Sequence, residues 1–423
     1  MKGLKLSLMV LTATMLAIGL SGMAYAFHSG GVAECGGCHS MHSPKDASGG
    51  FLLIASDQSS TCLSCHQQTG LATPSSYHIS TDAADMPTGV APKQRTPGGD
   101  FGWLKKSYTM TIRGTTTTEL GQTHGHNIVA TDFGYTADTD NVTAPGGTFT
   151  SSQLGCPTCH DPHSSNRRLS DGSYVKGSTR GTLSAPIIGS GSYDTSLTPA
   201  AGQAVGVYRL LRGLGDTSQS GVTYNGVAIA VAPGTYNLTE ATNQVRVAYG
   251  ATGTNTWGNW CAACHPNMHS SGNYVHPVDE NLGTEIAANY NAYIKSGDLT
   301  GVTASAFTSL VPFAENTGDI ATLQSHAKNN NSVLSGPGTS DKVTCFSCHR
   351  SHATGFPEML RFNLEGEFMV YNSLWPGTDT TPTVPQFARG RVGAETQAAY
   401  YDRPVTQFAS YQRVLCNKCH AKD

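Results

Sequence analysis

The pentapeptide Cys-x-x-Cys-His constrains this chain more than any other feature, because it is the attachment site of c-type haem. It occurs six times, and the six copies contain all 12 cysteines of the 423-residue chain. In each copy two thiols attach the haem, and the adjacent histidine is the proximal iron ligand. The predicted attachment residues are Cys35, Cys38, Cys62, Cys65, Cys156, Cys159, Cys261, Cys264, Cys345, Cys348, Cys416 and Cys419, and the proximal ligands are His39, His66, His160, His265, His349 and His420.

Zinc sites and disulfides also use paired cysteines. Neither explains why a histidine follows the second cysteine in all six pairs. The pattern therefore predicts six covalently attached haem c groups, each carrying an iron.

The composition predicts a fold in which haem supplies much of the apolar core. Only 38% of the residues are hydrophobic, and 48 are glycine. We expect a multihaem c-type cytochrome that is mostly coil, with short helices and a few short β-hairpins wrapped around six haems. Residues 27–423 then form a single unit. The net charge is −3, and no part of the sequence resembles a basic stripe. Both observations argue against a nucleic-acid partner.

Residues 1–26 have the features of a secretory signal peptide. Lys2 and Lys5 precede an apolar run over 6–20, and Ala24-Tyr25-Ala26 forms the cleavage site. An uncleaved anchor helix is the alternative, but the apolar run is short. No later run is long enough to span a membrane, so we expect export to or through the periplasm.

Local patterns predict a few regular elements between the motifs. We expect short strands around 127–135 and 142–150, and strands of hairpins at 205–211, 227–231 and 245–249. A helix is expected over 284–295, and another after the capping residue Asp319, running to Lys328 and carrying His326. Residues 43–61, 67–125 and 370–400 are expected to be loops and turns.

Ten histidines remain for the second axial positions. Three of them, His42, His163 and His352, lie three residues after a proximal histidine and so cannot reach the opposite face of their own haem. Each extended motif is preceded by an isolated histidine and followed by a plain motif. This order predicts three two-haem repeats, at roughly 28–66, 126–265 and 326–420.

The repeat assigns one distal histidine to each haem. His28, His126 and His326 are predicted for the even-numbered haems, and His42, His163 and His352 for the odd ones. His78 is the strongest competitor for any of these places, and His124 competes directly with His126.

The odd-numbered haems also predict an assembly. If each extended-motif histidine reaches back one repeat, His163 serves haem one and His352 serves haem three. Haem five then lacks a donor in its own chain, and His42 of a neighbouring subunit can supply it. Such a head-to-tail contact builds a filament. In the alternative, haem five takes His276 or His269 and the protein is a monomer.

Beyond the motifs, the chain resembles the OmcS-like hexahaem outer-surface c-type cytochromes of metal-reducing bacteria. The likeness extends over essentially the whole chain and includes 27–31, 97–106, 125–127, 161–163, 236–250 and 416–423. The resemblance implies an extracellular filament of stacked bis-histidine haems. It also implies an intersubunit ligand at His42 and electron delivery to metal oxides, other cytochromes or partner cells.

An electron conduit without catalytic residues is therefore the predicted function. Two imidazoles saturate each iron, which leaves no position for a substrate. A soluble periplasmic electron shuttle is the first alternative. A multihaem reductase is the second, and it requires an iron with an open position.

Overall fold

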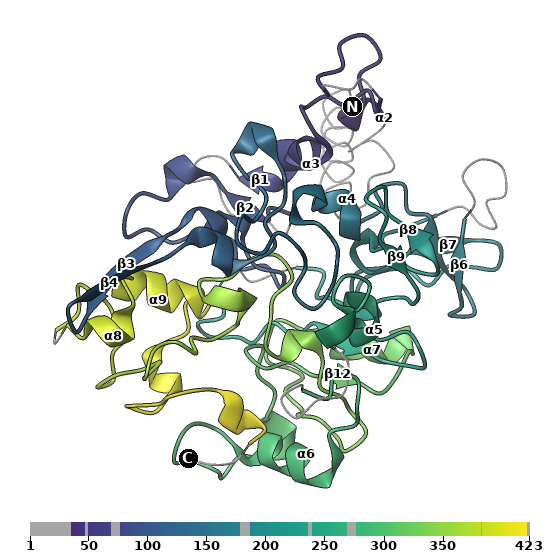
Figure 1. Cartoon of the computed structure of the whole chain (residues 1–423). Helices are drawn as coiled ribbons and strands as arrows, with labels where there is room; N and C mark the ends of the chain where they lie inside the picture. The colour runs from purple at the N-terminus through teal and green to yellow at the C-terminus, as the bar shows by residue number, and fades with distance from the viewer. Residues whose placement is uncertain are drawn as a thin grey trace, which may run out of the picture.

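The computed structural model describes residues 35–46, 50–68, 77–177, 187–235, 239–268, 276–381 and 383–420. Helices and strands in this part are short and are separated by long irregular segments (Figure 1). The α-helices are α2 (Cys35–Cys38), α3 (Gln58–His66), α4 (Cys156–Cys159), α5 (Trp257–Cys261), α6 (Gly283–Ala292), α7 (Ile320–His326), α8 (Pro385–Ala388) and α9 (Gly393–Ala399). The expectation of a mostly irregular fold is confirmed.

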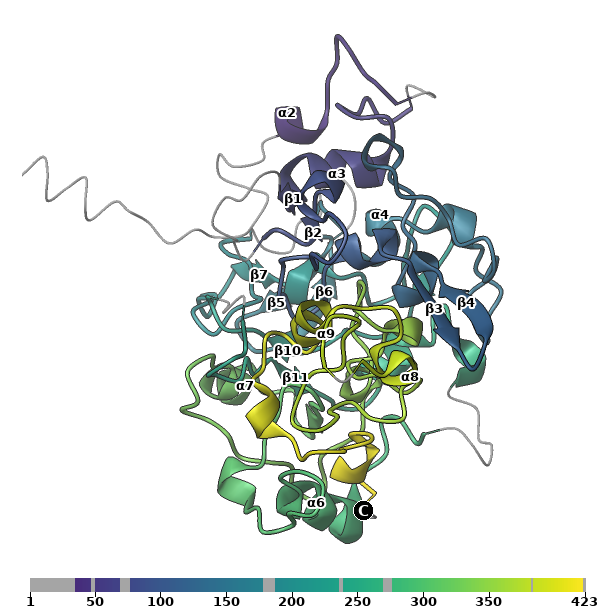
Figure 2. The same ribbon diagram turned by 90° about the vertical axis from the view of Figure 1, so that its left-hand side faces the viewer.

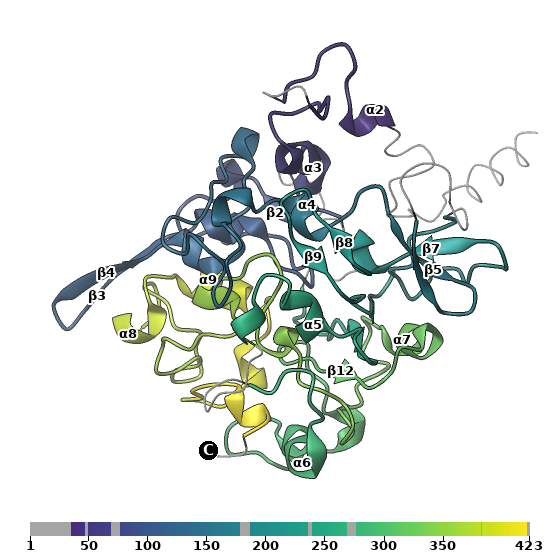
Figure 3. The ribbon, with the colours of Figure 1, turned by 45° about the vertical axis from the view of Figure 1, so that its right-hand side comes forward.

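The strands of the described residues form five small sheets of two or three members. They are β1 (Gln67–Gln68), β2 (Ser80–Thr81), β3 (Tyr108–Ile112), β4 (Thr115–Glu119), β5 (Asn166–Leu169), β6 (Tyr174–Lys176), β7 (Ala204–Gly206), β8 (Asp216–Thr217), β9 (Thr223–Tyr224), β10 (Ala230–Val231), β11 (Ala248–Gly250) and β12 (Ala314–Glu315). The β3–β4 hairpin pairs Tyr108 with Glu119 and Ile112 with Thr115, and it projects from the body of the molecule in Figure 3.

Each motif winds into a single turn that brings its cysteines and histidine together. The histidine N–H donates to the carbonyl of the first cysteine, as in His39 to Cys35 at 2.8 Å and His420 to Cys416 at 3.0 Å. Polar caps fix where several of these turns begin. Asp57, for example, accepts from the Ser60 N–H at the start of α3.

The apolar core of the described residues is divided into separate clusters, three of which have motif cysteines packed against them. One cluster holds Trp257, Trp260 and Phe346, with Cys159, Cys261 and Cys264 packed against it. Another is centred on aromatic side chains and includes Cys348 and Cys419 at its edge. The clusters therefore line the attachment sites.

Several local expectations are confirmed and others are wrong. The helix expected over 284–295 is α6, and the helix after Asp319 is α7, where the Asp319 carboxylate accepts from two backbone N–H groups. The loop expected over 370–400 instead contains α8 and α9, because Pro385 begins one helix and the Glu395 side chain caps the other. The loop expected over 67–125 contains the β3–β4 hairpin.

The strand expectations hold only in part. Strands β10 and β11 fall within or beside the ranges 227–231 and 245–249, and β7 occupies the start of 205–211. Within 127–135 and 142–150 the structure has only single bridges, Ala130 to Tyr135 and Thr143 to Thr150.

The first and last motifs lie at opposite ends of the molecule. Helix α2 is at one end in all three views and α6 at the other (Figures 1, 2 and 3). Helix α6 packs against the last motif turn, η12 (Cys416–Lys418). Across the described ranges, no helix is both long and apolar enough to cross a bilayer.

A buried ion-pair network fastens the end of β4 to the C-terminal segment. Glu119 pairs with His124 at 2.6 Å and with Arg391, and all three side chains are at most 5% exposed. Burial by itself raises the pKa of Glu119, but the hydrogen bond from His124 and the charge of Arg391 outweigh it and hold that pKa at about 2.

The low pKa of Glu119 predicts a loss of stability in acid. A carboxylate with a lowered folded-state pKa stabilises the fold above about pH 4.5, and this contribution, roughly 3 kcal/mol, is lost as the pH falls toward about 2. We expect the Glu119→Gln variant to melt at a lower temperature than the parent protein at neutral pH, with the difference shrinking across that acidic range. A melting difference that is unchanged by acid would contradict this account of Glu119.

Candidate haem-binding sites

Five motif histidines are oriented by a backbone carbonyl that accepts a hydrogen bond from ring atom Nδ1. The acceptors are Phe51 for His39, Tyr77 for His66, Arg209 for His160, Pro145 for His265 and Glu358 for His349, at 2.7 to 2.8 Å. A ring that donates from Nδ1 presents Nε2 as its metal ligand, and the hydrogen bond makes that nitrogen more basic. These five side chains therefore fit the role of proximal haem ligands.

The extended motifs share a further arrangement that was not anticipated from the sequence. In each, the proximal histidine forms an antiparallel bridge with a leucine, namely Leu53, Leu211 or Leu360. The carbonyl that accepts from Nδ1 lies two residues before that leucine, and the residue between them has a positive φ: Leu52 (55°), Leu210 (53°) and Met359 (57°). Bulky residues rarely adopt this backbone conformation, so no sequence signal marked these segments.

Among the described residues, a second histidine ring lies opposite four of the motif histidines. The ring centroids are 6.4 Å apart for His39 and His163, 6.4 Å for His160 and His352, 6.2 Å for His126 and His265, and 6.3 Å for His276 and His420. Two imidazoles that bind one metal from opposite sides, each through a bond of about 2 Å, place their centroids about 6.3 Å apart. The four pairs therefore fit a six-coordinate iron between them.

Three of these pairs match the predicted assignment and one differs from it. His163, His352 and His126 lie opposite the histidines of haems one, three and four. The structure brings His276, rather than His326, to His420 of haem six. The physical reason is the packing of α6 on η12, which carries the segment before α6 to the last motif and was not visible in the repeat order.

The remaining histidines are placed as follows. The ring of His124 is fully buried and uses both nitrogens, Nδ1 with the Trp103 carbonyl and Nε2 with Glu119, so neither nitrogen is left for iron. His326 is held through Nδ1 by Glu315 at 2.7 Å. His78 follows Tyr77, whose ring contacts His66, and burial and the nearby His66 lower the pKa of His78. His28 and His269 lie outside the described residues, as do residues 1–26.

His42 and His349 differ from the paired histidines. His42 is exposed on the segment that follows α2. His349 has its Nδ1 hydrogen bond, but within the described part of the chain no other histidine ring lies against it. Of the three extended motifs, the first and third have a facing histidine ring, at His39 and His160. The fifth motif has none among the described residues.

Cysteines of consecutive motifs lie near one another in sequence order. Cys62 is hydrogen-bonded to Cys156 and Cys261 to Cys345. Electrostatic interactions link Cys38 with Cys65, Cys159 with Cys264 and Cys348 with Cys416. Once haem is attached, these sulfurs are the thioethers at the edges of consecutive haems. The arrangement therefore forms one continuous series from the first motif to the last.

Comparison with known proteins identifies the family. The chain is 50% identical to the C-type cytochrome OmcS of Geobacter sulfurreducens, and the alignment covers all of both chains. This chain belongs to the OmcS family of c-type cytochromes.

Solved structures agree with this assignment. The fold matches a structure described as OmcS nanowires from Geobacter sulfurreducens, with a TM-score of 0.83 and 48% identity over 94% of this chain and all of that one. A second structure, an outer membrane cytochrome S filament from the same organism, matches with a TM-score of 0.84 over the same shares of the two chains. A scan against protein-family models found no match.

Replacing His352 with methionine should raise the potential of a single haem. The His352 ring is stacked on Phe101 at 4.6 Å and faces His160, so a thioether at this position would point toward an iron bound by His160. Histidine–methionine ligation gives a higher potential than ligation by two histidines. In a spectroelectrochemical titration, about one-sixth of the absorbance change should move to higher potential. An unchanged titration curve would show that His352 is not an axial ligand.

Proposed function

We propose that this protein carries electrons outside the cell through six covalently attached bis-histidine haems. The observation that carries the proposal is the set of four histidine pairs with centroids 6.2 to 6.4 Å apart, the spacing that one iron between two imidazoles requires. Haem supplies the redox chemistry when bound. The chain's own residues orient the ligands, set the spacing of the haems and exclude other ligands from the irons.

The ligand set follows from the ring pairs and the repeat. The six motif histidines are proximal, and His163, His352 and His126 are the distal ligands of haems one, three and four. For haem six the ring pair supports His276 in place of His326. His28 remains the proposed distal ligand of haem two, with His78 as the competing residue close to His66.

The series of haems then continues from one subunit to the next. His42 is exposed near one end of the molecule, and His349 lacks a histidine partner in the described residues. We infer that His42 of one subunit binds the fifth haem of the next, so that a head-to-tail homopolymer forms. The match to filament structures of an OmcS protein supports this assembly.

The shared backbone arrangement of the three extended motifs supports the threefold repeat. Each contains the same bridge to a leucine, the same carbonyl acceptor and the same positive φ. Residues 27–423 form one unit in this proposal, and residues 1–26 are the signal peptide that directs export through the periplasm to the cell exterior. Metal oxides and other cytochromes are the proposed acceptors.

Haem counting and carbon monoxide binding test the proposed function together. The purified protein should have the mass of the chain from Phe27 plus six haems, and the reduced spectrum of its filaments should not change when carbon monoxide is added. Carbon monoxide binds an iron with an open position, so a spectral change in the filaments would favour the reductase alternative. Haem-loaded monomers that never form filaments would favour the periplasmic shuttle.

A further inference from the structure

The distal ligands proposed for haems three and four, His352 and His126, lie on two segments that are hydrogen-bonded to each other. The His126 N–H donates to the His352 carbonyl at 2.9 Å. One residue along each segment, Gly125 and Ala353 form an antiparallel bridge. The ring of His126 is held by the same neighbouring segment, because its Nδ1 donates to the Ser351 carbonyl at 2.8 Å. The position of one distal ligand therefore depends on the segment that carries the other.

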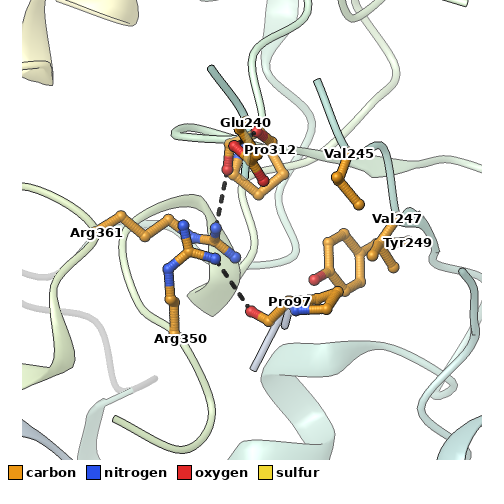
Figure 4. Close-up of a pocket in the computed structure, with 9 residues that line it drawn as sticks. Pro97, Glu240, Val245, Val247, Tyr249, Pro312, Arg350 and Arg361 are labelled. Carbon is orange, nitrogen blue, oxygen red and sulfur yellow. Dashed lines mark hydrogen bonds between the residues drawn. The ribbon is translucent and has the colours of Figure 1, made fainter. Parts of the chain in front are cut away.

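A third segment confines the segment of His352 from the other side. Arg350 donates from Nη1 to the Pro97 carbonyl at 3.3 Å (Figure 4). The His352 N–H donates to the carbonyl of the glycine that follows Pro97, at 2.7 Å. Gly99, the next residue, forms a parallel bridge with Ala353. The segment that carries His352 is therefore held between two others and has little freedom to move aside.

The approach of the two ligand segments leaves no room for a side chain at Gly125. Its φ of 179° is extended backbone that any residue can adopt, so the restriction comes from space and not from conformation. A Cβ atom at this position would overlap the His352 carbonyl oxygen and would lie 2.6 Å from the Ala353 Cβ. Carbon atoms in contact are normally about 3.5 to 4.0 Å apart. The two segments would therefore have to separate by about 1 Å.

We propose that Gly125 is a positioning residue that sets two distal ligands at once, His126 for haem four and His352 for haem three. This inference rests on the proposed haem ligation. The two rings face His265 and His160, with centroids 6.2 and 6.4 Å apart. A bond from imidazole to a metal is about 2 Å long and tolerates a change of about 0.2 Å, so a separation of about 1 Å breaks it. Whichever segment moves, an iron loses its distal ligand.

The Gly125→Ala variant should open the distal position of about one or two of the six haems. Carbon monoxide binds an open iron, so the reduced variant should bind more of it than the parent protein in the same assembly state. Added imidazole should fill the open positions and restore the spectrum of the parent protein, which general unfolding would not allow. Gly338→Ala is the matched control and should behave like the parent protein, because a Cβ there meets only the Asp341 carboxylate, at an ordinary contact distance of 3.8 Å.

The Ala353→Val variant tests the same contact from the opposite segment, with Gly125 unchanged. Ala353 is 0% exposed, so two added methyl groups must push the neighbouring segments away. We expect the same gain in carbon monoxide binding. If either variant carries six haems and binds no more carbon monoxide than the parent protein, Gly125 does not position the two ligands.

A cryo-EM structure of the parent filament decides the question even if neither variant is exported. The His126 N–H should donate to the His352 carbonyl while both imidazoles bind their irons, and Gly125 should lie too close to Ala353 for a methyl group to fit between them. Room for a methyl group would overturn the proposal. Parent filaments that have fewer than six haems, or that bind carbon monoxide, would overturn the proposed function instead, so the two failures are distinguishable.

Discussion

The His42→Ala variant should be exported and loaded with six haems but should not form filaments. His42 is exposed near one end of the molecule, whereas the fifth motif has no facing histidine ring among the described residues. Without the imidazole, the fifth iron of the neighbouring subunit loses its distal ligand, and the contact between subunits loses its metal bond. Electron microscopy of the sheared extracellular fraction measures the outcome directly.

Two comparisons make this result specific to the ligand. Ser43→Ala alters the adjacent exposed side chain and should leave filaments intact. In a mixture with the parent protein, His42→Ala subunits can still receive a histidine at haem five but cannot donate one. They should therefore end growing filaments and shorten them in proportion to their share. Filaments of normal length from pure His42→Ala protein would show that the ligand comes from elsewhere.

Protein made without covalent haem should not fold. The described helices have ten residues at most and the strands five at most, lengths that are marginal in isolation. The apolar clusters pack against motif cysteines, so the haems complete the core that these side chains begin. With all motif cysteines replaced by alanine, we expect loss of the circular dichroism of the native state, rapid proteolysis and no cooperative melting transition.

The holoprotein treated in the same way is the control for this experiment. It should resist protease and melt cooperatively under identical conditions. A haem-free chain that melts cooperatively would show that side-chain packing alone specifies the fold. Haem would then not be required for folding, and the low content of helix and strand would need another explanation.

The motif spacing predicted the chemistry well, because covalent attachment demands particular residues at fixed positions. The proximal histidines that it names stay a prediction, and the repeat order paired His163, His352 and His126 with the motif histidines that they face in the structure. The sequence favoured His126 but left His124 as a competitor. The structure separates the two, because Glu119 occupies a nitrogen of His124.

The histidine ring that faces His420 was not anticipated, for a tertiary reason. His276 reaches His420 because α6 packs on the last motif turn, a contact between segments more than one hundred residues apart. The positive φ angles of residues such as Leu52 and Met359 were not predicted, because leucine and methionine rarely adopt this backbone conformation. Helices α8 and α9 were missed in a segment rich in proline and glycine, where Pro385 starts a helix instead of preventing one.

The most direct test of a haem chain that continues from subunit to subunit is a cryo-EM structure of the extracellular filaments formed by this protein. We predict that the imidazole of His42 binds the iron of the fifth haem in the neighbouring subunit, and that His163, His352, His126 and His276 bind irons one, three, four and six within their own chain. A fifth haem with a ligand from its own chain, or with an open position, would contradict the account.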